Sequence, residues 1–139
     1  MNNALFTSNS EDWRTPPALF QRLDRMFRFD IDVAASDENH LCPRYFTKAD
    51  NGLAQPWGGA NWMNPPYGRA IAKWCAKADE EARKGNLTVG LVPARVDTAW
   101  WWKSCAHWHV VFLRGRLKFS NAKSGAPFPS ALVFFGIEK

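Results

Sequence analysis

The tetrapeptide Asn64-Pro65-Pro66-Tyr67 combines three groups that can hold a flat amine. It directly follows the apolar-to-aromatic run 59–63, which is typical of a buried strand that ends at a pocket. The two prolines have no backbone N–H and a fixed φ, so their carbonyls project in fixed directions. Asn64 Oδ1 and the Pro65 carbonyl can accept both N–H bonds of an exocyclic amine, while Tyr67 stacks on the ring. The segment predicts chemistry on an unstacked base, against the simpler alternative of a strand exit with a core tyrosine.

The composition fits one compact domain. The chain has 139 residues, of which 46% are apolar, enough for a single hydrophobic core. Its formal charge of +5, from 18 Lys and Arg against 13 Asp and Glu, favours a polyanionic partner without requiring one. The sequence has neither a run of about 18 apolar residues nor a basic segment followed by an apolar stretch, so we expect a soluble cytoplasmic protein.

The three cysteines, at positions 42, 75 and 105, are odd in number and widely spaced, which is no disulfide framework. Cys42 lies near His40, and Cys105 precedes His107 and His109, so a zinc site built from both clusters is conceivable. The spacing is not a usual zinc motif, and we therefore expect no metal.

The N-terminal third predicts an arm, a helix and a strand. Residues 1–12 are polar without periodicity and indicate a flexible arm. Thr15 is a candidate N-cap with Pro16 at the first helical position. The helix would share one apolar face, formed by Leu19, Phe20, Leu23, Met26 and Phe27. Residues 29–34 alternate and then turn apolar, as a strand entering a core does.

The rest of the chain alternates strands with helices. Signals are weak over 37–55, with a short strand around 45–46 and a turn at 50–52. Strands are predicted at 59–63, 87–92, 109–113 and 131–135. A helix after Gly68 would bury Ile71, Trp74, Cys75, Ala78 and Ala82 and end at Gly85. Asp97 or Thr98 would cap a helix carrying the three tryptophans 100–102.

This alternation predicts an α/β fold with a mostly parallel sheet covered on both faces, in one domain over 13–139. Ligands of such sheets bind beyond the carboxyl ends of the strands. We therefore expect Asp32, Asn64 and the loop 93–97 on one rim.

Five segments, in this order, resemble the phage-type DNA N6-adenine methyltransferases. They are Trp13-Arg14-Thr15-Pro16, Phe29-Asp30-Ile31-Asp32-Val33-Ala34-Ala35, Asp50-Asn51-Gly52-Leu53, Asn64-Pro65-Pro66-Tyr67 and Leu113-Arg114-Gly115-Arg116-Leu117-Lys118-Phe119. The resemblance runs from about residue 13 to 135. Asn-Pro-Pro-Tyr alone also occurs in methyltransferases that act on RNA or protein glutamine, so the combination of segments carries the substrate class.

The resemblance implies S-adenosylmethionine as methyl donor and a single-domain, Rossmann-like methyltransferase fold with an antiparallel last strand. Asp32 matches the acidic residue near the methionine moiety of the cofactor, and Ala34 would give close backbone approach. Thr15 and Pro16 match the segment that touches the cofactor carboxylate, at a helix N-terminus. Asp50 matches the carboxylate that accepts from the cofactor's adenine amino group. For both aspartates the alternative is a turn or cap residue.

The implied substrate is an adenine flipped out of double-stranded DNA. For phosphate contacts we favour a set of basic residues that follows the predicted strands 87–92 and 109–113, with residues 100–102 as a wedge or stacking surface. The set is Arg95, Arg114, Arg116, Lys118 and Lys123. A solvated basic face is the alternative for each of them.

Residues 33–36 contain no glycine, whereas many relatives carry a glycine-rich loop there, and no residue matches the carboxylate that holds the cofactor ribose. A second hypothesis is therefore a catalytically degenerate nucleic-acid-binding module of the same fold, and a third is an RNA or protein-glutamine methyltransferase. Cytosine C5 chemistry is rejected because it needs a Pro-Cys pair, whereas the chain has Cys42-Pro43. Asn64 favours adenine over cytosine N4, whose enzymes usually carry Ser-Pro-Pro.

Overall fold

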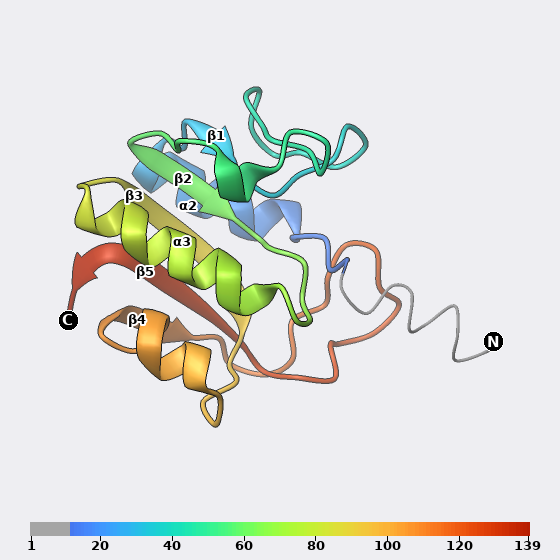
Figure 1. Ribbon diagram of the computed structural model, residues 1–139. Helices are drawn as coiled ribbons and strands as arrows, with labels where there is room; N and C mark the ends of the chain where they lie inside the picture. The colour runs from blue at the N-terminus through green and yellow to red at the C-terminus, as the bar shows by residue number, and fades with distance from the viewer. Residues whose placement is uncertain (1–11) are drawn as a thin grey trace.

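A computed structural model describes residues 12–139 and shows a five-stranded sheet in the order β1-β2-β3-β5-β4 (Figure 1). The strands β1, β2 and β3 are parallel, and β5 runs antiparallel to both β3 and β4. Their bounds are Ile31–Asp32, Ala60–Met63, Leu87–Pro93, Trp108–Phe112 and Ser130–Glu138 for β1 to β5. The predicted α/β class and the antiparallel last strand are confirmed, and the sheet is compatible with a methyltransferase-like fold. The sheet is mixed and not mostly parallel, because two of its four strand pairings are parallel and two are antiparallel. The predicted arm lies outside the described residues except for its last residue.

Two helices lie on opposite faces of the sheet, α2 (Pro17–Phe27) behind it and α3 (Ile71–Arg83) in front in Figure 1. The α2 face packs aromatic side chains onto the sheet, with ring centroids 5.4 Å apart for Phe20 and Trp62. All five predicted core residues of α3 are buried. Met26 was wrongly placed on the buried face of α2, because its side chain is 67% exposed near the end of the helix.

The start of α2 differs from its prediction. Pro16 occupies the N-cap position, Pro17 is the first helical residue, and no side chain caps the helix. The Thr15 hydroxyl instead accepts a hydrogen bond from Asn64 Nδ2 at 3.0 Å. Thr15 is therefore not the N-cap, because its side chain faces the end of β2.

The segment between β1 and β2 forms an irregular wall with little strand structure. The predicted strand 29–34 is reduced to β1, and the one around 45–46 to a single bridge between Tyr45 and Asp32. A short 3-10 turn, η1 (Gly52–Ala54), lies against β1. A Cβ atom on Gly52 would lie 2.4 Å from the Val33 carbonyl oxygen, so only glycine allows this approach.

The segment after β3 is a π-helical turn, η2 (Trp101–Cys105), in which the Ala106 N–H donates to the Trp101 carbonyl at 2.8 Å. Neither predicted cap holds this turn, because the Thr98 hydroxyl donates to the Arg95 carbonyl. The remaining predicted strands are confirmed, and β5 continues three residues beyond its predicted end, to Glu138.

The carboxyl ends of β1, β2 and β3 meet at one edge of the sheet, as predicted. Asp32, Asn64 and the loop after Pro93 follow these three ends. None of the helices in the described part of the chain is long and apolar enough to cross a membrane.

Candidate active site

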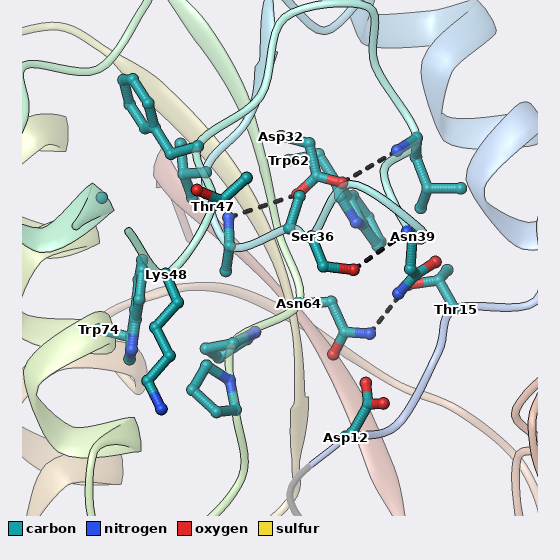
Figure 2. A pocket seen from close by; sticks show the side chains of 18 of the residues that line it. Asp12, Thr15, Asp32, Ser36, Asn39, Thr47, Lys48, Trp62, Asn64 and Trp74 are labelled. Atoms are coloured by element: carbon teal, nitrogen blue, oxygen red, sulfur yellow. Dashed lines mark hydrogen bonds between the residues drawn. The ribbon is translucent and has the colours of Figure 1, made fainter. Parts of the chain in front are cut away.

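A cavity of about 510 Å³ opens at this edge of the sheet (Figure 2). Five parts of the chain line it: residues 12–15, the end of β1, the irregular wall, the end of β2 and the start of α3. Its volume lies in the range of small-molecule sites. Its lining includes Thr15, Asp32, Ala34, Asn64, Pro65 and Pro66 of the predicted site.

The amide of Asn64 is held in one orientation by its nitrogen. Nδ2 donates to the backbone carbonyl of Trp13 and to the Thr15 hydroxyl. Since a carbonyl oxygen can only accept, this pair fixes which side of the amide carries oxygen. Oδ1 is buried and has no hydrogen-bond partner among the described residues. An unpaired buried acceptor costs free energy, so Asn64 is prepared to receive an N–H donor.

Trp62 presents a second unpaired polar atom to the same cavity. Its Nε1–H is buried without an acceptor in the described part of the chain, and the side chain has no exposed surface. Because side chains alternate along a strand, Trp62 and Asn64 lie two residues apart on the same side of the end of β2. Trp62 is not among the site residues predicted from the sequence. The signal was the strand alternation, which places Trp62 in register with Asn64.

Asp32 is a buried carboxylate at the end of β1, only 4% exposed. Its oxygens accept backbone N–H bonds from Leu41 at 3.0 Å and from Ala34 at 3.4 Å. Burial raises the pKa of Asp32 to about 6, although both hydrogen bonds and the nearby His40 oppose the rise. A cation placed in the cavity would favour the ionised carboxylate.

Asp50 does not reach the cavity. Its Oδ2 accepts from the backbone N–H and the hydroxyl of Thr47, at 2.8 and 3.0 Å, and so closes the local turn. Thr47, Lys48 and Asn51 line the cavity, but Asp50 is absent from the lining. The structure therefore does not support its predicted contact with the cofactor adenine and favours the alternative of a turn residue.

The N-terminus of α2 is a weak anion site. Pro16 and Pro17 have no N–H groups, and the N–H groups of Leu19 and Phe20 both bond to the Pro16 carbonyl. Thr15 lines the cavity, whereas Pro16 does not. The buried Trp62 N–H is another donor without a partner among the described residues, in a side chain that lines the cavity.

The segment 12–15 is held on two sides. Asn64 binds it from the sheet, and Asn121 binds it from the long loop between β4 and β5. Asn121 Oδ1 accepts from the Arg14 N–H at 3.0 Å, and its Nδ2 donates to the Asp12 carbonyl at 2.8 Å. We call residues 12–15 the strap.

A second cavity, of about 420 Å³, lies beyond the two prolines. Tyr67 and Gly68 line it, whereas Pro65 and Pro66 line the first cavity, so the tetrapeptide separates the two. The Tyr67 ring is 5% exposed and its hydroxyl donates to the Leu91 carbonyl at 2.9 Å. Burial raises its pKa well above the usual tyrosine value. The ring is a core side chain in this structure, which favours the alternative of a core tyrosine over its predicted stacking on a base.

One of the predicted phosphate-binding residues lines the second cavity, and the other four lie in the loop between β4 and β5. Arg95 lines this cavity, and its guanidinium lies 5.8 Å from the centre of the Phe128 ring. The other four are exposed in the loop between β4 and β5: Arg114, Arg116, Lys118 and Lys123. The histidines and cysteines of the zinc alternative do not assemble a metal site over residues 12–139.

Comparisons with known proteins agree with this arrangement. A family model described as DNA N-6-adenine-methyltransferase (Dam) matches residues 3–132. A DNA N-6-adenine-methyltransferase of Escherichia phage T1 is 36% identical over 91 residues, which cover 63% of this chain and 38% of the phage protein. The protein YfdM of Escherichia coli (strain K12), which carries a methyltransferase name, is 35% identical over 65 residues, covering 41% of this chain and 71% of that protein.

The phage relative is much longer than the stretch it shares with this chain, whereas the family model covers nearly the whole chain. The matched residues include β1, the tetrapeptide and the strands β3 and β4, and therefore the described cavity and its lining. The chain belongs to the DNA N-6-adenine-methyltransferase (Dam) family.

Proposed function

We propose that this protein transfers a methyl group from S-adenosylmethionine to the N6 amino group of an adenine flipped out of double-stranded DNA. The observation that carries the proposal is the unpaired Oδ1 of Asn64, held at the cavity by two hydrogen bonds from its own nitrogen. The family name supplies the substrate class, and a methyltransferase implies S-adenosylmethionine as donor.

The first cavity fits the cofactor. The cavity offers a buried acidic group, Asp32, to a positively charged group of the cofactor. It also offers a buried N–H, that of Trp62, to a negatively charged group of the cofactor. The close approach of Gly52 to Val33 shapes the cavity wall, although no glycine-rich loop follows β1. When bound, S-adenosylmethionine supplies an activated methyl group on a sulfonium.

The residues of the chain contribute position and electrostatics. The lone pair of an adenine amine is delocalised into the ring, and two acceptors on its N–H groups favour localising it on nitrogen. Asn64 Oδ1 is one acceptor, and the Pro65 carbonyl is the other, at the wall of the cavity. An amide cannot act as a general base, so the surplus proton leaves to water after transfer. Flipping the base costs a few kcal/mol, which DNA contacts must offset.

Transfer of labelled methyl from S-adenosylmethionine to unmethylated double-stranded DNA tests this function, with the modified base identified by mass spectrometry. We expect N6-methyladenine from the wild type and a loss of about 100-fold or more in kcat for Asn64→Ala. The matched control is Asn86→Ala at the opposite edge of the sheet, where the side chain bonds to Glu81. Transfer only to RNA or protein, or unchanged transfer by Asn64→Ala, would refute the proposal.

A further inference from the structure

Three large apolar side chains are exposed together around η2. Trp102 is 65% exposed, Phe112 is 61% exposed and Val96 is 48% exposed. The Trp102 Nε1–H donates to the Val96 carbonyl at 2.8 Å, and Phe112 stacks on the neighbouring Trp101 with ring centroids 6.0 Å apart. We call Val96, Trp102 and Phe112 the ridge.

The ridge is held in place by buried neighbours. Trp101 is 3% exposed and contacts both Phe112 and Trp100, which lines the second cavity. Three rings therefore lead from the wall of that cavity to the surface. The hydrogen bond at Nε1 fixes one edge of the Trp102 indole, so the exposed ring is ordered before any partner binds. π-helical turns often occur at functional sites.

The stretch of chain that carries the ridge and the loop after β4 is strongly basic. Residues 94–129 contain six Lys or Arg and one acidic residue, Asp97. Over the described residues no ion pair joins any of these six to a carboxylate. The six are Arg95, Lys103, Arg114, Arg116, Lys118 and Lys123. Exposed aromatic rings among unpaired cations are the features of a surface that binds bases and phosphates together.

We infer that the ridge stacks on DNA bases beside the extruded adenine, with Trp102 as the principal stacking ring. The inference rests on the proposed function for its partner. Removing a base from the duplex exposes the faces of its neighbours, and an ordered indole next to the second cavity can cover them. The cations hold the flanking phosphates. A second copy of the chain is a poorer occupant, because it would bring the same six cations face to face.

Fluorescence anisotropy with two labelled duplexes tests the ridge. One duplex carries a single unpaired adenine, and the other is fully paired with the same flanking sequence. We expect the wild type to prefer the first duplex, and Trp102→Ala to weaken its binding about tenfold, in the range of one base stack. The loss for the paired duplex should be smaller, and the dependence on salt unchanged, because no charge is removed. Phe112→Ala should act in the same direction.

Met26→Ala is the matched control, since it removes an apolar side chain that is 67% exposed on α2. It should bind both duplexes as the wild type does. The inference is overturned if Trp102→Ala keeps the wild-type preference for the duplex with the unpaired adenine, or if Met26→Ala loses as much affinity as Trp102→Ala does. It is also overturned if the wild type elutes from gel filtration as a dimer that Trp102→Ala dissociates, since the ridge would then join two copies.

Methyl transfer by the same proteins separates this inference from the proposed function. If the wild type methylates double-stranded DNA but Trp102→Ala binds the duplexes as the wild type does, only the inference about the ridge is refuted. If the wild type transfers no methyl group to DNA but Trp102→Ala still weakens duplex binding, the ridge is supported and only the catalytic proposal is refuted.

Discussion

Asn64 and Trp62 show how one strand end can supply two complementary unpaired atoms to a cavity. The acceptor and the donor lie two residues apart, and each would cost free energy if it stayed unpaired. Asn64 could be predicted because it opens a motif of recognisable chemistry. The unpaired state of Trp62 could not, because it depends on the irregular wall across the cavity, for which the local sequence signals were weak. The contact of Asp50 with the cofactor stays a prediction; its side chain accepts a hydrogen bond from Thr47, only three residues away, in a local turn.

Asp32 predicts a pH dependence of cofactor binding. The free protein carries this carboxyl protonated below about pH 6, because burial raises its pKa to about 6. A cationic ligand favours the ionised form, so S-adenosylmethionine must displace the proton at lower pH. We expect affinity to fall about tenfold per pH unit below about 6 and to level off above it. Isothermal titration calorimetry at several pH values between about 4.5 and about 8 measures this affinity.

The control for this titration is Asp32→Asn, which should bind weakly with an affinity that does not change across the same range. A wild-type profile as flat as that of Asp32→Asn would contradict a role for this carboxyl. The linkage to stability has a definite sign: the raised pKa stabilises the unliganded fold below the ordinary value of 3.8, and this contribution is lost as pH rises through about 6.

The regular elements were the most predictable part of the fold. The apolar face of α3 is confirmed residue by residue, because a helix with five apolar positions at helical spacing has one way to face a core. The wall between β1 and β2 was not predictable, because its backbone folds back and bonds to β1 instead of forming a regular element of its own. The Asp32 N–H, for example, donates to the Arg44 carbonyl at 3.1 Å. The π-helical form of η2 also has no signature in the sequence.

The close approach of η1 to β1 requires a glycine at position 52. In Gly52→Ala the new Cβ would meet the Val33 oxygen at 2.4 Å and the Trp74 ring at 3.1 Å. Because backbone and a buried ring cannot both move freely, we expect a loss of about 1–3 kcal/mol in the free energy of unfolding and weaker cofactor binding. Denaturant unfolding and calorimetry measure the two effects.

Gly59→Ala is the paired control, since its Cβ would meet only Asp30 Oδ2 at an ordinary 3.6 Å. It should change the free energy of unfolding by no more than about 0.5 kcal/mol. Equal effects of the two substitutions would mean that the contact of η1 with β1 is not what makes Gly52 necessary.

Across the whole molecule, charge is distributed unevenly. The six unpaired cations lie between residues 94 and 129, whereas acidic residues of α3 pair with their neighbours, as Asp79 does with Arg83 at 3.4 Å. The sequence predicted five of these cations as a group, because their run after β3 and β4 is visible in the order of residues. Their exposure, and the absence of ion pairs from them over the described residues, could be known only from the fold.

We expect the substitution Arg114→Ala to change the salt dependence of DNA binding. Each phosphate contact contributes a slope of about 0.9 in the plot of log affinity against log salt concentration. We expect this substitution to reduce the slope by about that amount for any duplex sequence. Arg83→Ala, which removes a paired arginine at the far end of α3, should leave the slope unchanged. Anisotropy titrations from 50 to 200 mM, about the range in which counterion release dominates, measure both.

The position of β5 has a consequence for how the protein is made. This strand follows β4 along the chain, yet it lies between β3 and β4, and among the described residues it is the only strand that pairs with β4. A ribosome delivers the chain from its N-terminus, so β3 has one open edge and β4 has no partner until residues 130–138 emerge. Asn121, which secures the strap beneath Asn64, also arrives late. Asn121 reaches the strap only after every residue that lines the first cavity has left the ribosome, so the strap that orients the Asn64 amide gains this second anchor late.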